Sequence, residues 1–239
     1  QLILSKEISN NTGVYWAYCP TNLHYNKLNN KMYVYGSFSI ATKIDNVNFS
    51  TGNPNNGVIQ SIISEFDIST LNLTRHLQFY NNSNLQIPQE YNNNTHTLNN
   101  AYFAETNDYL YGFGSFSKNM TLGNTNLTSS STLSSSGYTY NHEDLVLFKI
   151  NLNNFQPEVL FKSNTTMQPN QYGSLNAADE IFIHNDEVYV SANFTAKPIV
   201  MNGTTINNNS GNGDTDVLFY KYNANSLNSV SSNSPVCIN

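Results

Sequence analysis

NNKMYVYGSFS, at residues 29–39, recurs twice along the chain, as NDYLYGFGSFS at residues 107–117 and as NDEVYVSANFT at residues 185–195. Both spacings are 78 residues, without insertion or deletion. Three sets of markers keep this spacing: Asn29, Asn107 and Asn185; Tyr33, Tyr111 and Tyr189; Phe38, Phe116 and Phe194. A fixed period of this length is the sequence signature of a repeat architecture. Three periods of 78 make 234 of the 239 residues, so the sequence predicts a single repeat domain over residues 1–239.

Each copy of the unit predicts four β-strands, A to D, in chain order. The quoted stretch contains strand B, where Tyr33 and Tyr35 alternate at the period of two that a half-buried strand shows. Asn and Asp before it favour a tight turn after strand A. The other predicted strands are A at 23–28, 101–106 and 179–184, C at 58–66, 145–150 and 217–222, and D at 74–79 and 158–162. A long polar loop is predicted between strands B and C, including 129–136 and 207–212. Because helical periodicity is absent, the predicted fold class is all-β.

Strand C carries a second signature, DLVLFK at 144–149 and DVLFYK at 216–221, where the first copy has Gln60 and Glu65 at the terminal positions. The order of strand, Asn-Asp turn, YVYGSFS strand, long loop and DVLFYKYN strand resembles the SBBP-type β-propeller repeats of large extracellular proteins. The resemblance covers all three copies and implies four-stranded antiparallel blades with no particular activity. The period is longer than is usual for such blades, and Ala192 replaces the glycine of the other two copies.

The chain ends are out of phase with the repeat. Residues 2–7 lie as far before their strand B as the predicted D strands do, whereas residues 227–233 are polar and make a poor fourth strand. The predicted units are about 23–79, 101–163 and 179–239, preceded by an N-terminal strand at 1–9. This strand would complete the last blade, either in cis, closing a ring, or in trans, joining a neighbouring chain. Propellers have about four to eight blades, so a ring of three is disfavoured. A piece of a longer array is the third interpretation.

The composition limits the partners. Charged residues make up 11% of the chain, against about 25% in typical soluble proteins. The aromatic content of 13% is enough for a packed core. A net charge of −6 with ten Lys and Arg residues shows no basic patch, so nucleic acid is not an expected partner. No apolar run approaches 18 residues, so no membrane span is expected. The chain begins at Gln1 rather than Met, which suggests a processed product or a fragment.

Eleven Asn-X-Ser/Thr sequons suggest an extracellular or cell-surface glycoprotein. A chain so rich in Asn, Ser and Thr produces most of them by chance, so their placement in polar loops carries the inference. The acceptor residues are Asn10, Asn48, Asn72, Asn81, Asn93, Asn119, Asn126, Asn164, Asn193, Asn202 and Asn208. Cys19 and Cys237 would pair as a disulfide outside the cell, within or between chains, and would remain two thiols in a cytosolic protein.

Few residues of the chain carry a recognisable chemical signature. The five histidines show no metal-ligand spacing, no nucleophile or phosphate motif occurs, and neither a metal nor a cofactor is expected. Asp214 and Asp216 are spaced like part of a calcium loop, although a turn-capping role for Asp216 is favoured because it aligns with Asp144. The neighbouring Glu143 and Asp144 would face opposite sides of a strand. We therefore do not expect an enzyme.

Two functions follow from these observations. The first is an extracellular, glycosylated structural protein that assembles with copies of itself into a fibre or surface layer. The alternative is an adhesin or lectin-like module that binds extracellular carbohydrate. Tyr15, Trp16 and Tyr18 form an aromatic cluster that would suit sugar stacking, although packing at a ring centre or subunit interface is the preferred interpretation.

Overall fold

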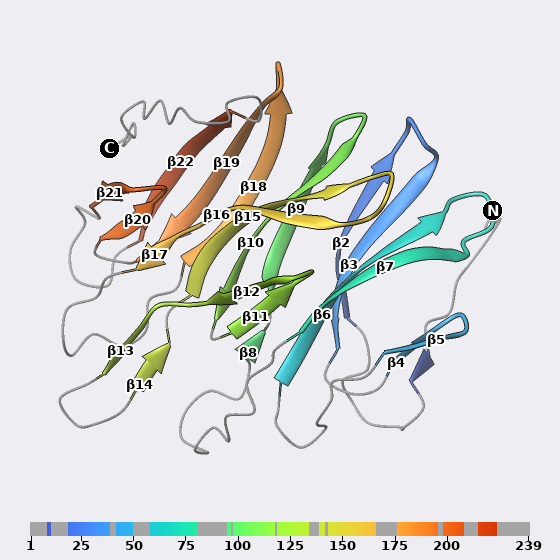
Figure 1. The fold of residues 1–239 in the computed structure, drawn as a ribbon, viewed down its shortest axis with the longest axis horizontal. Coiled ribbons are helices and arrows are strands. Elements are labelled where there is room, and N and C mark those ends of the chain that lie inside the picture. The colour runs from blue at the N-terminus through green and yellow to red at the C-terminus, as the bar shows by residue number, and fades with distance from the viewer. Residues whose placement is uncertain are drawn as a thin grey trace.

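The computed structural model describes residues 9–10, 19–38, 42–49, 58–80, 95–96, 98–117, 119–133, 139–141, 143–165, 176–195, 198–207 and 215–223. Over these residues the protein consists of strands and turns, with no helix. The predicted all-β class is therefore confirmed. The strands form three main sheets, which lie side by side in an open row, and several smaller ones (Figure 1).

Each main sheet is built from one copy of the repeat. The first contains β2 (Cys19–Asn26), β3 (Lys31–Phe38), β6 (Val58–Asp67) and β7 (Leu73–Phe79), in that spatial order. The middle one contains β9 (Asn99–Glu105), β10 (Tyr109–Ser117), β15 (Glu143–Asn151) and β16 (Pro157–Lys162). The third contains β18 (Asn176–His184), β19 (Glu187–Phe194) and β22 (Asp216–Asn223). These pairings are antiparallel, and β8 (Thr95–His96) adds a short parallel pairing to β6. The predicted strands A, B and C are thus confirmed in all three units and strand D in the first two.

The strand registers confirm the repeat residue by residue. Strand B pairs with strand C so that its last Phe lies opposite the first residue of the strand C signature: Phe38 and Gln60, Phe116 and Asp144, Phe194 and Asp216. The recurring Tyr lies opposite the last residue of that signature: Tyr33 and Glu65, Tyr111 and Lys149, Tyr189 and Lys221. Equivalent positions in different sheets can therefore be assigned from hydrogen-bonded partners, without an alignment.

The predicted turn after strand A differs in length between units. In the third sheet Asn185 and Asp186 form a two-residue turn, with φ values of 50° and 62°. Both angles lie in the left-handed region that Asn and Asp adopt more easily than other non-glycine residues. In the first sheet the connection is longer, and Asn30 has a φ of 54°. The tight turn is therefore confirmed in the third unit only, because four residues make the connection in the first unit (27–30) and in the middle unit (106–109).

The prediction of a polar loop between strands B and C is wrong over much of its length. Each unit has a short hairpin there: β4 and β5 (Thr42–Ile44, Val47–Phe49), β11 and β12 (Asn119–Leu122, Thr125–Thr128), and β20 and β21 (Ile199–Met201, Thr204–Ile206). The middle unit adds a second hairpin, β13 and β14 (Ser131–Leu133, Thr139–Asn141). Strands of three or four residues carry too few apolar positions to show a period, which is why the pattern hid them.

A short strand pairs with the first strand of two of these hairpins. β17 (Asn164–Thr165), directly after strand D of the middle sheet, pairs with β20 of the third unit. β1 (Ser9–Asn10) pairs with β4 of the first unit in the same way. Between them, Tyr80 follows strand D of the first sheet and bridges to Thr121 of the middle unit. After each of the two described D strands, the next segment therefore reaches the hairpin of the following unit.

Two apolar cores lie between the sheets. The first joins Tyr33, Tyr35 and Ile63 of the first sheet to Phe103 and Phe148 of the middle sheet, among others. The second joins the middle and third sheets; its members include Tyr111, Phe113, Leu145, Leu147, Val188, Val190 and Leu218. A smaller core lies between the outer side of the first sheet and its hairpin. The A strands line up, since β9 lies beside both β2 and β18. The row is therefore held together by sheet-on-sheet packing.

Candidate functional site

Alternation along strands B and C fixes which neighbour each side chain meets. In strand B of the first sheet, odd-numbered Tyr33 and Tyr35 enter the core shared with the middle sheet, while even-numbered Val34 enters the outer core. The middle sheet repeats this rule, because Tyr111 and Phe113 face the third sheet and Leu110 faces the first. Each sheet thus has a head face toward the preceding unit and a tail face toward the following unit.

The tail face of the third sheet is apolar and exposed. Its exposed fractions are 54% for Phe182, 49% for Val217 and 58% for Phe219. The cross-strand registers put these residues on the same side of the sheet as Tyr189, since Phe182 lies opposite Tyr189 and Phe219 opposite Ser191. At the positions equivalent to Val217 and Phe219 the middle sheet has Leu145 and Leu147, both fully buried against the third sheet. In this face, residues that pack in the middle of the row meet solvent at its end.

A polar group borders the aromatic residues of this tail face. The rings of Phe182 and Tyr189 are stacked, with centroids 4.8 Å apart and an interplanar angle of 4°. The Tyr189 hydroxyl donates to Glu187 at 2.7 Å, and Lys221 pairs with the same carboxylate at 2.7 Å. The hydrogen bond from Lys221 lowers the pKa of Glu187, and the hydrogen bond to Glu187 raises that of Tyr189. An aromatic platform with a charged rim is therefore presented to solvent.

The head face of the first sheet is exposed in part. Leu23 is 60% exposed and Tyr25 is 41% exposed. They lie opposite Val34 and Met32, on the side away from the middle sheet. The hairpin β4–β5 covers the rest of this side with Ile44 and Phe49. At the position of Leu23 the other two sheets have Phe103 and Ile181, which are buried in the joints between sheets.

Among the described strands, β22 lies at an edge of the third sheet. In the first two sheets strand C has two neighbours, since β6 lies between β3 and β7, and β15 lies between β10 and β16. The structure describes one strand neighbour for β22, namely β19. Residues 227–233, predicted to be a poor fourth strand, lie outside the described residues, as do residues 1–8. Of the predicted N-terminal strand at 1–9, the structure describes only Ser9.

The joint between the first and middle sheets shows how two units are fixed to each other. The buried carboxylate of Glu65 accepts hydrogen bonds from Tyr33 at 3.1 Å, from Thr74 at 2.6 Å and from Arg75 Nε at 2.9 Å. Arg75 also donates to the Leu152 carbonyl at 2.8 Å and lies 4.7 Å above the Phe155 ring. Both acceptors belong to the middle unit, so this guanidinium spans the joint.

The Glu65 carboxylate is tuned by these partners. Burial raises its pKa, whereas hydrogen bonds from Arg75 and Thr74 lower it by more, so its pKa lies below the ordinary value. Burial raises the pKa of Tyr33 to about 12. The same joint contains a second polar contact, in which His24 Nε2 lies 3.0 Å from Glu105. Asn22 donates to the Ala101 carbonyl at 3.0 Å beside it.

Asp144 organises the joint on the other side of the middle sheet. It is fully buried and accepts from the Ser130 backbone at 2.7 Å and from Thr165 at 2.9 Å, and Lys162 lies 3.2 Å away. Asn176 of the third sheet donates to the Thr165 hydroxyl at 3.0 Å. These contacts tie the loop before β13, strand D and the next unit to one carboxylate. Asp144 therefore has a structural environment, but it links separate segments rather than capping a local turn, since its donors Ser130 and Thr165 lie 14 and 21 residues away.

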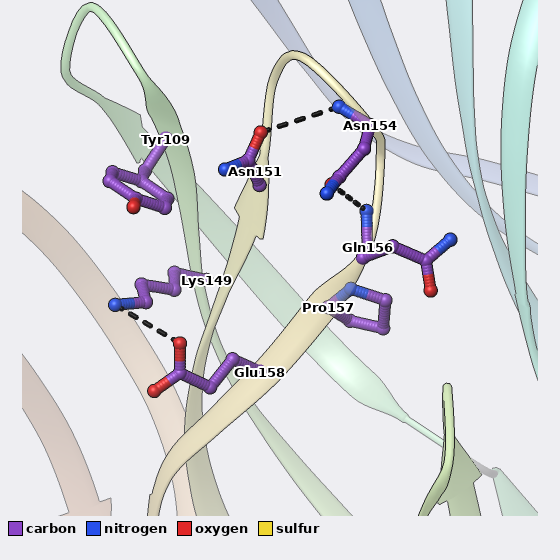
Figure 2. Close-up of a pocket in the computed structure, with 7 residues that line it drawn as sticks. All are labelled: Tyr109, Lys149, Asn151, Asn154, Gln156, Pro157 and Glu158. Carbon is purple, nitrogen blue, oxygen red and sulfur yellow. Dashed lines mark hydrogen bonds and ion pairs between the residues drawn. The ribbon is translucent and has the colours of Figure 1, made fainter.

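A small polar cavity opens at the turn between β15 and β16 (Figure 2). Its volume is about 240 Å³, and it is lined by Tyr109, Lys149, Asn151, Asn154, Gln156, Pro157 and Glu158. Lys149 pairs with Glu158 at 3.1 Å and lies 4.7 Å above the Tyr109 ring. The loop side is closed by turn hydrogen bonds, in which Asn154 N donates to Asn151 and Gln156 N donates to Asn154. Glu158 is the one carboxylate among the lining residues, and glycoside hydrolysis ordinarily requires two.

The predicted glycosylation sites fall into three groups. Asn48, Asn72, Asn126, Asn164 and Asn202 are exposed. Asn119 and Asn193 are half-buried in β11 and β19. The side chains of the other four lie outside the described part: Asn10, Asn81, Asn93 and Asn208. The exposed Asn48, Asn126 and Asn202 belong to the hairpins of the three successive units, so each unit presents one acceptor on its hairpin.

Several other residues that the sequence singled out do not form a common site among the described residues. The side chain of Cys19, all of Cys237 and the aromatic cluster of Tyr15, Trp16 and Tyr18 lie outside the described residues, as does Asp214. His24 contacts Glu105, and His76 packs edge-on against Phe49, with ring centroids 4.9 Å apart. Within the described ranges no group of three or more His, Cys, Asp or Glu side chains is placed to hold a metal ion. Over the same ranges no helix is long and apolar enough to cross a membrane.

The sequence did not reveal the exposed end faces. The signal was present in the strand C signature, where Leu145 and Leu147 of the second copy align with Val217 and Phe219 of the third. Equal hydrophobicity at equivalent positions implies equal need for burial, but the pattern alone does not say which copy has a neighbour. Comparisons with known protein families and with curated proteins found no match for this chain.

Proposed function

We propose that this chain is an extracellular, glycosylated structural protein whose copies assemble end to end into a fibre or surface layer. In this proposal each main sheet is a blade, and the N-terminal strand of one copy completes the third blade of the next copy. The observation that carries the proposal is the position of β1. It occupies in the first unit the place that β17, the segment after a D strand, occupies in the third unit.

The spacing supports this assignment of phase. Strand D of the middle sheet has six residues, one residue follows, and the two residues of β17 then pair with the next hairpin. Residues 2–7 are also six, Ile8 follows, and the two residues of β1 pair with β4. With one residue between them, a D strand and the following short strand must lie close together. A D strand formed by residues 2–7 would therefore belong to a sheet stacked on the head face of the first sheet.

The arrangement of the row favours completion in trans. The first and third sheets lie at opposite ends, with the middle sheet between them (Figure 1). A strand held close to the head face of the first sheet is thus far from β22 of its own chain. The acceptor edge would be supplied by β22 of another copy, by strand addition. A head-to-tail contact of this kind is heterologous and produces filaments when it does not close.

The extracellular part of the proposal rests on the exposed sequons. One exposed acceptor on the hairpin of each unit would carry glycans on three successive units. A low content of charged side chains is compatible with a surface covered by sugar or by neighbouring copies. Removal of N-glycans by an amidase should shift the mass of the secreted protein, and an unshifted mass would contradict this part.

Assembly is tested by deletion of residues 1–9. The full chain should form long particles in negative-stain images and sediment as large species, whereas the truncated chain should remain monomeric with unchanged far-UV circular dichroism. A synthetic peptide of residues 1–9 added in excess to the full chain should shorten the particles, because it competes for the edge of β22. A truncated chain that still polymerises would overturn the proposed function.

A second candidate is a carbohydrate-binding adhesin. The stacked Phe182 and Tyr189 rings, with Glu187 and Lys221 beside them, offer an aromatic face and polar groups to a sugar. Glycan-array binding by a monomeric chain, abolished by Phe182→Ser, would favour this candidate over assembly.

A further inference from the structure

We infer that the tail face of the third sheet docks on the head face of the first sheet of a second copy, so that the junction between copies repeats the joints inside the chain. This inference rests on the proposed function and deepens it, because strand completion names one strand of the junction and the docking names the two sheet faces that meet there. The tail face is Phe182, Val217 and Phe219 with their neighbours, and the head face is Leu23 and Tyr25.

The occupant follows from continuity with the two internal joints. Val217, Phe219 and Leu23 each have an equivalent that a neighbouring sheet of this same chain buries, and the equivalents of Phe182 and Tyr25 are partly buried. Leu147 replaces Phe219 in the middle sheet, and Phe103 replaces Leu23. Large apolar side chains that are exposed together on a sheet mark an interaction site. Inside this molecule a tail face is covered by the head face of the next unit. The partner that offers a head face to the third sheet is therefore a second copy of the chain.

One pair of positions shows how the junction is formed. In the first joint His24, on the tail face, meets Glu105, on the head face, at 3.0 Å. By register, Phe182 is equivalent to His24, because each lies opposite the recurring Tyr of its strand B. Tyr25 is equivalent to Glu105, because they lie opposite Met32 and Leu110. The polar contact of the first joint thus becomes an aromatic pair between copies, Phe182 against Tyr25.

A second pair is complementary in size. In the first joint the rings of Tyr35 and Phe103 lie 6.1 Å apart. Their equivalents at the junction are Ser191 on the tail and Leu23 on the head. The small Ser191 side chain leaves room beside Phe219, its cross-strand partner, for the protruding Leu23. The first joint packs two large rings against each other, whereas the junction would place the large Leu23 side chain in the space beside the small Ser191.

The same faces argue against a tail-to-tail dimer. Asp179 and Glu180 are exposed on the tail face, where Asp179 accepts from Ser191 and Glu180 lies opposite Ser191. Two tails in contact would bring four carboxylates into one interface, and like charges facing each other disfavour a contact. A tail against a head avoids this, so the assembly has a direction.

The experiment converts the junction into a copy of the first joint. Phe182→Lys should place a charge against Tyr25 and abolish assembly, and Tyr25→Glu should do the same from the other side. The double variant should restore at least half of the assembled mass, because the two new charges meet where His24 and Glu105 meet. Sedimentation velocity and negative-stain imaging give the readout, and thermal unfolding of each monomer shows that the exposed substitutions leave the fold intact.

The matched control is Tyr80→Lys. Tyr80 is 47% exposed, but it lies at the joint between the first two units rather than on an end face. This variant should assemble like the wild type. Single variants that assemble normally, or a double variant as defective as the singles, would overturn the inference while dependence on residues 1–9 still upheld the proposed function. A wild-type chain that never assembles would overturn both, and glycan binding lost in Phe182→Lys would assign the tail face to carbohydrate instead.

Discussion

The middle and third sheets are built from equivalent strands, yet the middle sheet is covered on both faces and the third on one. Leu147 is buried against a neighbour, while Phe219, at the same register, is more than half exposed. The difference arises from position in the row rather than from composition, since both residues are large and apolar. In a repeat array each unit buries its faces only by stacking, so the end units keep unsatisfied faces unless a cap or another copy covers them.

The largest expected effect contrasts these two residues directly. Leu147→Ala removes a fully buried side chain and should destabilise the chain by about 2–5 kcal/mol. Phe219→Ala in the monomer should change the free energy of unfolding by less than about 0.5 kcal/mol, because its side chain is exposed. Urea unfolding, at a protein concentration too low for assembly, measures the free energy of unfolding of both variants. Equal losses in the two variants would mean that the third sheet is covered in the monomer.

Much of the fold could be predicted from the sequence, whereas the hairpins and the joints between sheets could not. The 78-residue period and the alternation in strands A to C located the eleven described main strands of the three sheets, because long strands carry several apolar positions at a clear period. The hairpins were not predicted, because strands such as β4 and β5 have only three residues each and are too short to show a period. The contacts between sheets were not predicted, because the hydrogen bond from Arg75 to the middle unit depends on how two sheets stack. A local sequence pattern contains no information on that stacking.

The next effect compares two ion pairs at one position of the repeat. Glu65 and Arg75 lie opposite each other in the first sheet, and Lys149 and Glu158 take their places in the middle sheet with the charges reversed. Glu65 is buried and accepts from Arg75, the side chain that spans two units, so Glu65→Gln should cost about 1.5–3 kcal/mol. Glu158 is largely exposed, and a surface ion pair contributes about 0–1 kcal/mol, so Glu158→Gln should change little. Chemical unfolding at pH 7 compares them.

The same pair predicts a dependence on pH. The pKa of Glu65 is below its ordinary value in the folded chain, because hydrogen bonds from Arg75 and Thr74 outweigh burial. Its contribution is therefore present above the unfolded-state pKa and is lost as the pH falls through the folded-state pKa. The stability difference between wild type and Glu65→Gln should be constant near neutral pH and shrink below about pH 4. A difference that grows on acidification would contradict the assignment.

A smaller effect tests how strictly the units can exchange residues. Gly112 occupies the register held by Val34 in the first sheet and Val190 in the third. A Cβ atom at Gly112 would lie 2.3 Å from the nearest atom of the Phe148 ring. Gly112→Val, although it copies the other units, should therefore destabilise the middle sheet by about 1–3 kcal/mol through overpacking. A neutral result in thermal unfolding would mean that the Phe148 ring moves aside easily.

The smallest effect on stability is expected at the glycosylation acceptors of the hairpins. The same substitutions give the clearest test of an extracellular location. Asn48 and Asn126 occupy equivalent positions in β5 and β12, with Lys43 and Thr121 opposite them, and both side chains are exposed. A glycan there would extend into solvent away from the sheet joints, so Asn48→Gln should change the unfolding temperature little while removing one glycan from the mass of the secreted chain. Asn193 is the matched contrast, because it is half-buried in β19 and should be occupied less often. Mass spectrometry of the intact chain and of its peptides measures occupancy at each site. Full occupancy at Asn193 with none at Asn48 would mean that the hairpins, rather than the sheets, are covered in the assembled protein.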